Sequence, residues 1–246
     1  MSYVHKEDTH NLNAPGEIVP VIISLINPKS VVDIGCGVGT FLHIFKEHGI
    51  TDLKGLDGEW VNMNLLEKYL SANEFSKENL SEFVDVKRKY DLAICLEVAE
   101  HIEEVNANQL IKTLTNASDI ILFSAAIPFQ SGQFHVNEQW PSYWKEKFNQ
   151  VGYELFDAIR HQFWQYQFSE FWYKQNMFFA VRKDVVSNYP FLSIHPAHSP
   201  LNIVHPDLFI KNSRLLHHIE TGKQPIGFYL KLLIKSMLVK CGLIKR

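Results

Sequence analysis

The sequence predicts an α/β fold with a doubly wound sheet, and three features support this prediction. Residues 30–34 form an apolar run that leads through a glycine-rich loop, residues 35–39, into an amphipathic segment, which is the pattern of strand, turn and helix. Short apolar runs then alternate with helical segments. Two further strand-like runs, residues 154–160 and 177–182, close this region.

The elements between these landmarks follow from the spacing of apolar residues and from turn residues. Pro28 and Gly152 each follow a helical pattern, and neither residue continues a helix easily. We therefore expect helices at residues 14–26, 41–48, 63–70, 103–117 and 141–151, and strands at residues 30–34, 53–58, 75–80, 90–96 and 118–125.

Charge divides the chain into two parts. Residues 185–246 hold eight Lys or Arg and two Asp or Glu, a net charge of +6, so the rest of the chain carries −9. Because an acidic surface repels phosphates, we expect no nucleic-acid partner. Three cysteines make no disulfide framework, the N-terminus is too polar for a signal peptide, and no uncharged run is long enough to span a bilayer. We expect a cytoplasmic protein with a domain at residues 1–183 and an extension at residues 184–246.

The glycine loop narrows the choice of ligand. Its third glycine, Gly39, comes one residue earlier than in the dinucleotide fingerprint G-x-G-x-x-G, and no Gly-Lys-Ser/Thr follows as in a P-loop. Asp33, two residues before the first glycine, repels a pyrophosphate but attracts an ammonium group. Asp57 ends the next strand, where nucleoside-binding folds place an acid on the ribose hydroxyls. A solvated turn Asp is the alternative reading.

Two segments resemble a known family. Val31–Phe41 resembles motif I of the class I S-adenosylmethionine-dependent methyltransferases, and Leu96–Ile102, LEVAEHI, resembles a second signature of that family. The resemblance covers roughly residues 10–183. It implies a Rossmann-like, seven-stranded, mostly parallel sheet with an antiparallel C-terminal strand pair, and S-adenosyl-L-methionine as cofactor. The segment 135–144, HVNEQWPSYW, is similar to relatives that modify surface polysaccharides.

The resemblance also implies the cofactor contacts. The glycine loop passes under the methionine part, Asp57 holds the ribose, and Asn79-Leu80 takes the adenine where many relatives have Asp-Leu. A loop Asn without a ligand is the alternative at that position. The expected cofactor-binding residues are Asp33, Gly35, Cys36, Gly37, Asp57, Gly58, Asn79, Leu80, Leu96 and Glu97.

Two histidines, His101 and His135, fall on loops at the carboxyl edge of the expected sheet and are the candidate catalytic residues. A hydroxyl acceptor must lose a proton when it is methylated, and a near-neutral imidazole suits that role. We expect His135 to be the base or to position the acceptor; the alternative is that it only holds its loop. His101 is expected to cap a helix or orient the loop, together with Glu100.

Polar and aromatic side chains around these loops suit a sugar-type acceptor. For the aromatic-rich segment 163–173, the alternative is a lid or a dimer contact. The expected substrate-binding residues are Gln133, Asn137, Trp140, Trp164 and Tyr173. No Cys or carboxylate completes a metal-ligand set around His195, His198 or the pair His217-His218, so we expect no metal.

Residues 185–224 hold four of the ten prolines, so we expect a loop with short helices there. The extension then ends in an apolar helix, residues 226–244. Lys231, Lys235 and Lys245 lie on roughly one face and Lys240 lies opposite. This pattern suits contact with an anionic membrane at its inner face, or packing on the same domain or on a second copy in a homodimer.

The sequence therefore predicts a methyltransferase that uses S-adenosylmethionine, with O-methylation of a sugar or glycan precursor as the expected reaction. One alternative is a non-catalytic protein of the same fold that acts as partner or scaffold of a glycosyltransferase. Another is a nicotinamide-dependent oxidoreductase, which the early third glycine disfavours.

Overall fold

The computed structural model describes residues 10–166, 170–194 and 201–243. The chain divides into two compact units, residues 1–205 and 206–246. The first unit contains the sheet and the helices that cover it, and the second contains two helices. Because each unit has its own internal contacts, we describe them separately.

The sheet of the first unit has seven strands in the order β3-β2-β1-β4-β5-β7-β6. The first five strands along the chain are parallel, and β7 runs antiparallel to both of its neighbours, which confirms the predicted fold class. The strands are β1 (Ser30–Ile34), β2 (Asp52–Asp57), β3 (Phe75–Lys77), β4 (Leu92–Leu96), β5 (Ile120–Ser124), β6 (Tyr153–Phe156) and β7 (Phe178–Arg182).

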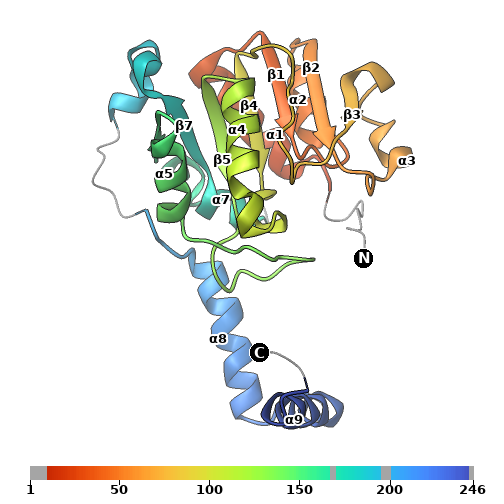
Figure 1. Ribbon diagram of the computed structural model, residues 1–246. Helices are drawn as coiled ribbons and strands as arrows, with labels where there is room; N and C mark the ends of the chain where they lie inside the picture. The colour runs from red at the N-terminus through yellow and green to blue at the C-terminus, as the bar shows by residue number, and fades with distance from the viewer. Residues whose placement is uncertain (1–9, 167–169, 195–200, 244–246) are drawn as a thin grey trace. The chain divides into compact units, whose positions relative to one another are not determined.

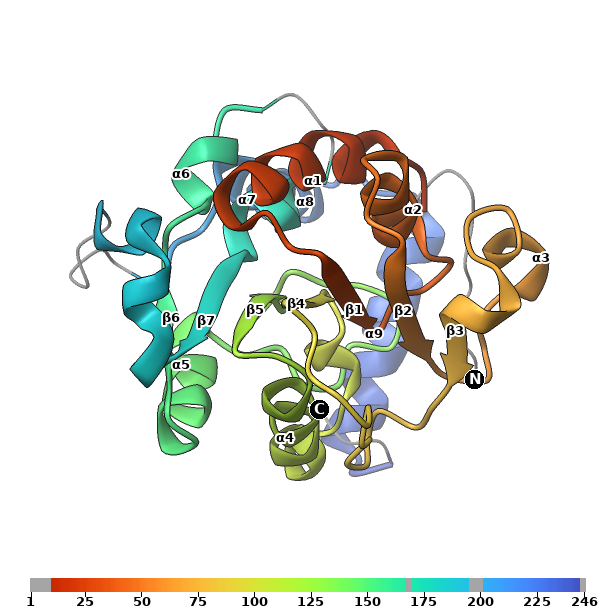
Figure 2. The same cartoon turned by 90° about the horizontal axis from the view of Figure 1, so that it is seen from above.

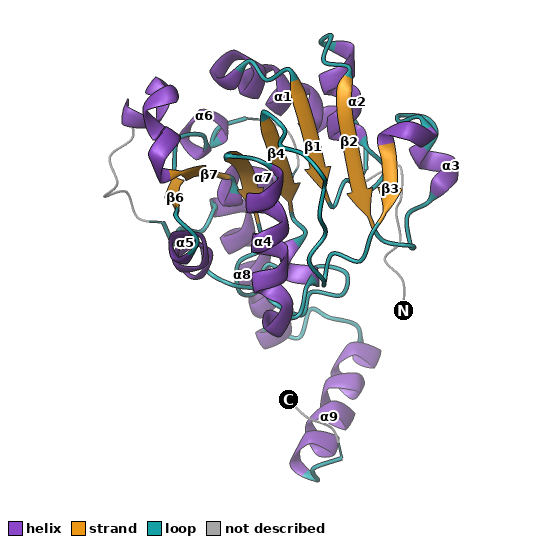
Figure 3. Cartoon of the chain, turned by 45° about the horizontal axis from the view of Figure 1, so that its top comes forward, coloured by secondary structure: helices purple, strands orange, loops and turns teal. Residues whose placement is uncertain are grey.

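Helices cover both faces of this sheet, as the view along the strands shows (Figure 2). One face carries α1 (Asn13–Ile26), α2 (Thr40–Glu47), α6 (Arg160–Phe163) and α7 (Phe171–Asn176). The other face carries α4 (Ala107–Ala117) and α5 (Pro141–Gln150), and α4 lies in front of the strands in Figure 3. A short helix, α3 (Met63–Leu66), lies beside β3.

Strand alternation divides the apolar side chains between these two layers. Val31 and Ile94 pack in the cluster under α1 and α2, whereas Val32 and Ala93 pack in the cluster under α4 and α5. Successive side chains of a strand point to opposite faces, so each strand serves both cores. Every position of β1, β4 and β5 is buried, as expected for central parallel strands.

The second unit differs most from the sequence expectation. Its first helix, α8 (Pro206–Glu220), has 15 residues, where the prolines of this region had indicated loop and short helices. Pro206 is the first residue of α8, and a proline there loses no hydrogen bond. The Tyr229 hydroxyl of α9 (Ile226–Lys240) donates to the carbonyl oxygens of His218 and Ile219, both at 3.0 Å.

The compact units meet at residue 206, whereas the sequence placed a domain boundary at residue 184. The segment after β7 explains this difference. Two short 3₁₀ helices, η4 (Lys183–Asn188) and η5 (Pro190–Ile194), bring Val186 and Leu192 into the core of the first unit. In the part of the chain that the structure describes, no helix combines the length and the hydropathy needed to cross a bilayer.

Arg160 ties three segments of the first unit together. Its guanidinium is 1% exposed and donates to the carboxylate of Asp157 and to the carbonyl oxygens of Gln175 and Leu201. Arg160→Met is expected to lower the free energy of unfolding by about 3 kcal/mol, because these acceptors lose their charged donor. Urea denaturation followed by circular dichroism measures the change.

The control for this prediction is Arg88→Met. Arg88 pairs with Asp52 at the surface, where an ion pair contributes less than about 1 kcal/mol. Equal losses in the two variants would contradict the role assigned to Arg160.

Candidate active site

The loops that follow β1, β2, β4 and β5 all leave the sheet at its carboxyl edge, and the green loop after β5 runs along this edge in Figure 1. Ligands of open parallel sheets bind at this edge. The residues expected to hold a cofactor and those expected to act on an acceptor therefore emerge on the same side of the sheet.

The glycine loop requires glycine for two physical reasons. Gly35, Gly37 and Gly39 have φ of 91°, 54° and 87°, a conformation that other residues adopt rarely. In addition, a Cβ on Gly35 would lie 2.2 Å from Cγ2 of Val98, and one on Gly39 would lie 2.6 Å from Leu70. The loop therefore packs directly on the segment after β4, and α2 begins immediately behind it.

Asp57 is fixed against this loop. Its Oδ2 accepts the backbone N–H of Gly37 at 2.7 Å and its Oδ1 accepts that of Gly58 at 2.6 Å. Burial raises the pKa of this carboxyl, while the two N–H groups and the Trp60 side chain, which also donates to it, oppose that effect. A carboxylate offers about four acceptor positions, so these three bonds leave room for a ribose hydroxyl. The ring of Trp60 covers Gly58, where a Cβ would meet it at 2.3 Å.

The other expected cofactor residues occupy different environments. Asp33 is buried near the end of β1, and burial, followed by the charge of Asp57, raises its pKa well above the ordinary value. Cys36 and Leu96 are also buried. Asn79 is exposed and holds a turn, since its amide donates to Glu82 at 2.9 Å and its Oδ1 accepts the N–H of Ser81 at 3.1 Å.

Leu80 places its side chain in the core cluster on the α4 and α5 face of the sheet. The adenine contacts of Asn79 and Leu80 therefore stay a prediction.

Glu97 is the centre of a network that the sequence did not reveal. Its carboxylate accepts from Gln130 at 2.7 Å and from Asn176 at 3.0 Å, and Asn176 also donates to Gln130 at 2.9 Å. Both amides are buried and come from the loop after β5 and from the end of α7. Desolvation raises the pKa of Glu97, and the bonds from these amides oppose it. Isolated Gln and Asn residues beside apolar strands carry no recognisable sequence signal.

His135 lies beside His101, with ring centres 5.0 Å apart. The loop that carries His135 is held in place because the N–H groups of Val136 and Asn137 donate to the carbonyl oxygen of Glu100 at 2.9 and 3.0 Å. His135 Nδ1–H donates to Glu138 at 2.8 Å, and its Nε2 lies 4.0 Å from the Glu100 carboxylate.

His101 contacts the carbonyl oxygen of Phe134 through Nδ1 at 3.4 Å. Burial, and then the neighbouring His135, lower the pKa of His101 to about 4. The structure thus brings the two candidate catalytic histidines together. It also places the carboxylate of Glu138, to which the sequence analysis assigned no role, in contact with His135.

The expected substrate-binding residues do not form one group. Gln133 is exposed and Asn137 is buried in the loop that carries His135, and the partly exposed Trp140 directly precedes α5. Tyr173 instead packs edge-on against Phe41 of α2, with ring centres 5.5 Å apart.

Trp164 contacts His205, with ring centres 4.6 Å apart. Trp164 and Tyr173 therefore both contact aromatic side chains of the first unit, and their roles toward a substrate stay a prediction.

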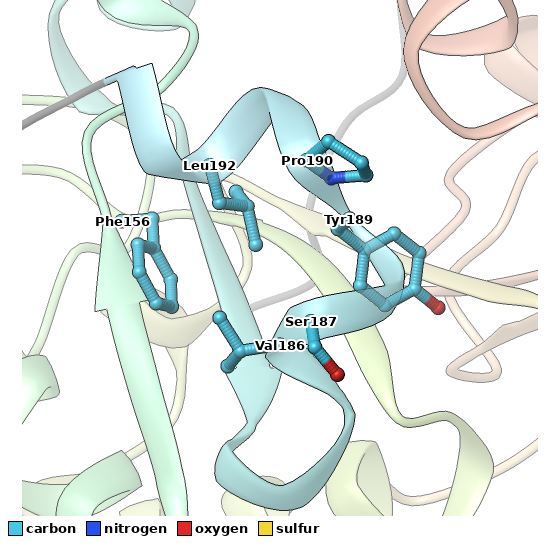
Figure 4. A pocket seen from close by; sticks show the side chains of 6 residues that line it. All are labelled: Phe156, Val186, Ser187, Tyr189, Pro190 and Leu192. Atoms are coloured by element: carbon cyan, nitrogen blue, oxygen red, sulfur yellow. The ribbon is translucent and has the colours of Figure 1, made fainter.

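A pocket of about 330 Å³ lies elsewhere, between the end of β6 and the segment that follows β7 (Figure 4). None of the candidate cofactor, catalytic or substrate-binding residues is among the residues that line it. Its lining is mostly apolar and consists of Phe156, Val186, Ser187, Tyr189, Pro190 and Leu192.

Solved structures with this fold include several methyltransferases. A sugar N-methyltransferase from Streptoalloteichus sp superposes with a TM-score of 0.54 at 12% identity, covering 74% of this chain and 97% of that one. DesVI from Streptomyces venezuelae gives a TM-score of 0.52 at 10% identity, with 68% and 89% covered. A candidate O-methyltransferase from Nostoc punctiforme gives 0.51 at 14% identity; the match covers 69% of this chain but only 56% of that one.

No curated protein matches the chain in sequence. A family model described as "Methyltransferase domain" matches residues 13–172, which is more than half of the chain. The residues fit the cofactor of this family, since the glycine loop lacks side chains and the Asp57 carboxylate is fixed beside it. The chain therefore belongs to the methyltransferase domain family and uses S-adenosyl-L-methionine as its cofactor.

Proposed function

We propose that the chain is an O-methyltransferase that acts on a sugar or glycan precursor. The observation that carries this proposal is the pair of histidines at the carboxyl edge, where His135 is held by Glu138. A hydroxyl group must lose its proton on methylation, so an imidazole at the edge of the sheet that also carries the cofactor loop suits an oxygen acceptor. The sugar N-methyltransferase with the same fold supports a sugar-type acceptor.

The chain's own residues have three tasks in this reaction. Bound S-adenosylmethionine supplies an electrophilic methyl group, and transfer is an in-line displacement that depends on alignment. The glycine loop and Asp57 hold the nucleoside, and the amide network around Glu97 keeps the edge of β4 rigid. The loop after β5 then presents the acceptor.

His135 is the residue assigned to the acceptor hydroxyl. When Nδ1–H is donated to Glu138, the Nε2 of a neutral ring keeps its lone pair and points toward Glu100. His135 then serves as the base or positions the acceptor, with His101 beside it. Gln133, Asn137 and Trp140 are proposed to contact the sugar, and Trp164 and Tyr173 to extend that surface.

The α9 helix supports a second proposal, contact with an anionic membrane. No residue of α9 is buried. Ile226, Leu230, Leu233, Ile234 and Met237 are each at least half exposed and follow the helical repeat, so they share one face. Lysines are the only charged residues of this helix, at positions 231, 235 and 240. An apolar face with basic neighbours suits the surface of an anionic bilayer.

A methyl-transfer screen tests the proposed function. The chain is incubated with isotopically labelled S-adenosylmethionine and with nucleotide sugars or cell-surface glycan fragments. We expect label in a sugar product, and carbon NMR distinguishes an O-methyl from an N-methyl group. A stoichiometric protein partner in a pull-down, with no transfer to any glycan, would instead favour the non-catalytic partner of a glycosyltransferase.

Asp57→Ala is expected to abolish cofactor affinity, because the ribose loses its carboxylate and the N–H groups of Gly37 and Gly58 lose their acceptor. Calorimetric titration with S-adenosylhomocysteine measures the affinity. Asp52→Ala, at the exposed opposite end of β2, is the control and should bind normally. Normal binding by both variants would remove Asp57 from the cofactor site.

His135→Ala is expected to lower kcat about 100-fold or more, the usual contribution of a group that handles the reacting proton. The Kd for S-adenosylmethionine should stay unchanged, since the contacts assigned to the cofactor lie in other loops. His161→Ala, an exposed histidine, is the control. Parallel losses in kcat and in cofactor affinity would contradict the assignment.

Leu233→Asp is expected to weaken sedimentation with vesicles containing phosphatidylglycerol at least about tenfold, because a charge replaces an apolar contact. Ser236→Asp adds the same charge away from the apolar face and should weaken binding much less. Vesicles of phosphatidylcholine alone should bind poorly. Light scattering that shows a dimer, together with no vesicle binding, would assign this face to a second copy of the chain.

A further inference from the structure

Three side chains with metal-binding atoms meet at the carboxyl edge of the sheet. They are Glu100, His101 and His135, and one ligand atom of each lies within 4.8 Å of the others. Metal–ligand bonds to nitrogen and oxygen are ~2.0–2.2 Å long, so an ion would draw these atoms about 1 Å closer through side-chain rotation. The cluster joins the turn after β4 to the loop after β5, which are distant in sequence.

Glu100 is the observation that points to a ligand. Its side chain is 1% exposed, and neither carboxylate oxygen has a well-formed hydrogen bond; the donors that face it are the backbone N–H groups of Glu100 and Ala126. Buried polar groups in proteins are almost always paired, and an ionised carboxylate without a partner is costly. Burial, and then the negative charge of Glu97, raise the pKa of Glu100 well above its ordinary value, and the backbone N–H groups of Glu100 and Ala126 oppose this effect only in part. A cation among the three side chains removes this cost.

The contacts around the cluster are those that orient metal ligands. His135 donates Nδ1–H to the Glu138 carboxylate at 2.8 Å, and His101 Nδ1 lies 3.4 Å from the carbonyl oxygen of Phe134. A metal-binding histidine usually donates its other nitrogen to a carboxylate or a carbonyl oxygen in this way. These contacts leave Nε2 of His135 directed toward Glu100, 4.0 Å from its Oε1.

The backbone fixes the same arrangement. The Glu100 carbonyl oxygen accepts two N–H groups from the loop, at Val136 and Asn137. Gly132 lies against the imidazole, since a Cβ there would be 2.0 Å from Nε2 of His135. The position of His135 relative to Glu100 is therefore set by the fold and not by the two side chains alone.

We propose that Glu100, His101 and His135 bind a divalent cation of the first transition row, such as Mn²⁺ or Zn²⁺. Two imidazoles and one carboxylate favour these ions over Mg²⁺ and Ca²⁺, which prefer oxygen ligands. Three protein ligands leave coordination positions open. The sequence-based expectation of no metal was argued from other histidines. A Glu-His pair and a distant His form no recognisable ligand motif, so the sequence did not indicate this cluster.

The open positions accept a hydroxyl oxygen of the acceptor, and this step rests on the proposed function. Coordination lowers the pKa of the hydroxyl, so its proton passes to solvent as the oxygen attacks. The bond between the acceptor oxygen and the methyl carbon then forms while the bond between that carbon and the sulfur breaks. The electron pair of the broken C–S bond stays on the sulfur, which becomes a neutral thioether. With a cation bound, His135 takes the second of the two roles proposed above: it positions the acceptor through the metal, and the metal acidifies the hydroxyl.

Calorimetry on the full-length protein tests the site without any acceptor. After treatment with a chelator, the protein is titrated with MnCl₂, ZnCl₂ and MgCl₂. We expect one equivalent of Mn²⁺ or Zn²⁺ to bind per chain and Mg²⁺ to bind far more weakly. Glu100→Gln should lose this binding, while Glu103→Gln, an exposed neighbour, should keep it. Glu138→Gln should weaken it about 10–100-fold.

Thermal unfolding shows whether a variant that fails to bind is folded. Without metal, Glu100→Gln should unfold cooperatively at the wild-type temperature or above, since an amide replaces the buried acid. The cation should raise the Tm of wild-type protein but not of this variant. The metal site would be overturned if wild-type protein and Glu100→Gln bound the cation equally well, or if neither protein bound it. Metal binding without transfer to any glycan would leave the site intact and reject the proposed acceptor.

Discussion

The pairing of β1 with both β2 and β4 is the constraint on which the site depends. In this register Ile34 lies opposite Leu56, and Asp33 lies opposite Ile94, so the three strands end at the same edge. The glycine loop, Asp57 and the turn that carries Glu100 all begin there. The positions of the site residues therefore depend on the pairing of the parallel strands, which brings these segments close to one another.

Four carboxyl groups lie close to this edge, and three of them, Asp33, Asp57 and Glu100, are buried, which is rare for acidic side chains. Asp33, Asp57, Glu97 and Glu100 all have raised pKa values, with desolvation as the largest cause in each case. Asp57 and Glu97 accept well-formed hydrogen bonds from N–H groups and amides, whereas Glu100 accepts none of that geometry. Groups of this kind cost stability and cluster where binding or catalysis needs them.

The sequence predicted the parts of the site that depend on local chemistry. The glycine spacing and the acid at the end of β2 are readable because the backbone itself requires glycine at positions 35, 37 and 39. The fold class followed from the alternation of apolar runs. Prolines misled the prediction for α8, because Pro206 marks a helix start as readily as a loop.

The remaining parts depend on contacts between distant segments. Gln130 and Asn176 are 46 residues apart and become partners only when β5 and β7 pair. Glu100 was visible in the sequence, but its lack of a well-formed hydrogen bond is a property of the packed interior. Identifying the metal-binding cluster required the distance between two loops, which no local pattern contains.

Val98 joins the two halves of this site. Its side chain fills the space above Gly35, and it stands in the chain between Glu97 and Glu100. The glycine loop and the turn that carries Glu100 and His101 are therefore in direct van der Waals contact. Because protein interiors are closely packed, neither segment can move without displacing Val98, and the cofactor loop and the proposed metal ligands share one mechanical support.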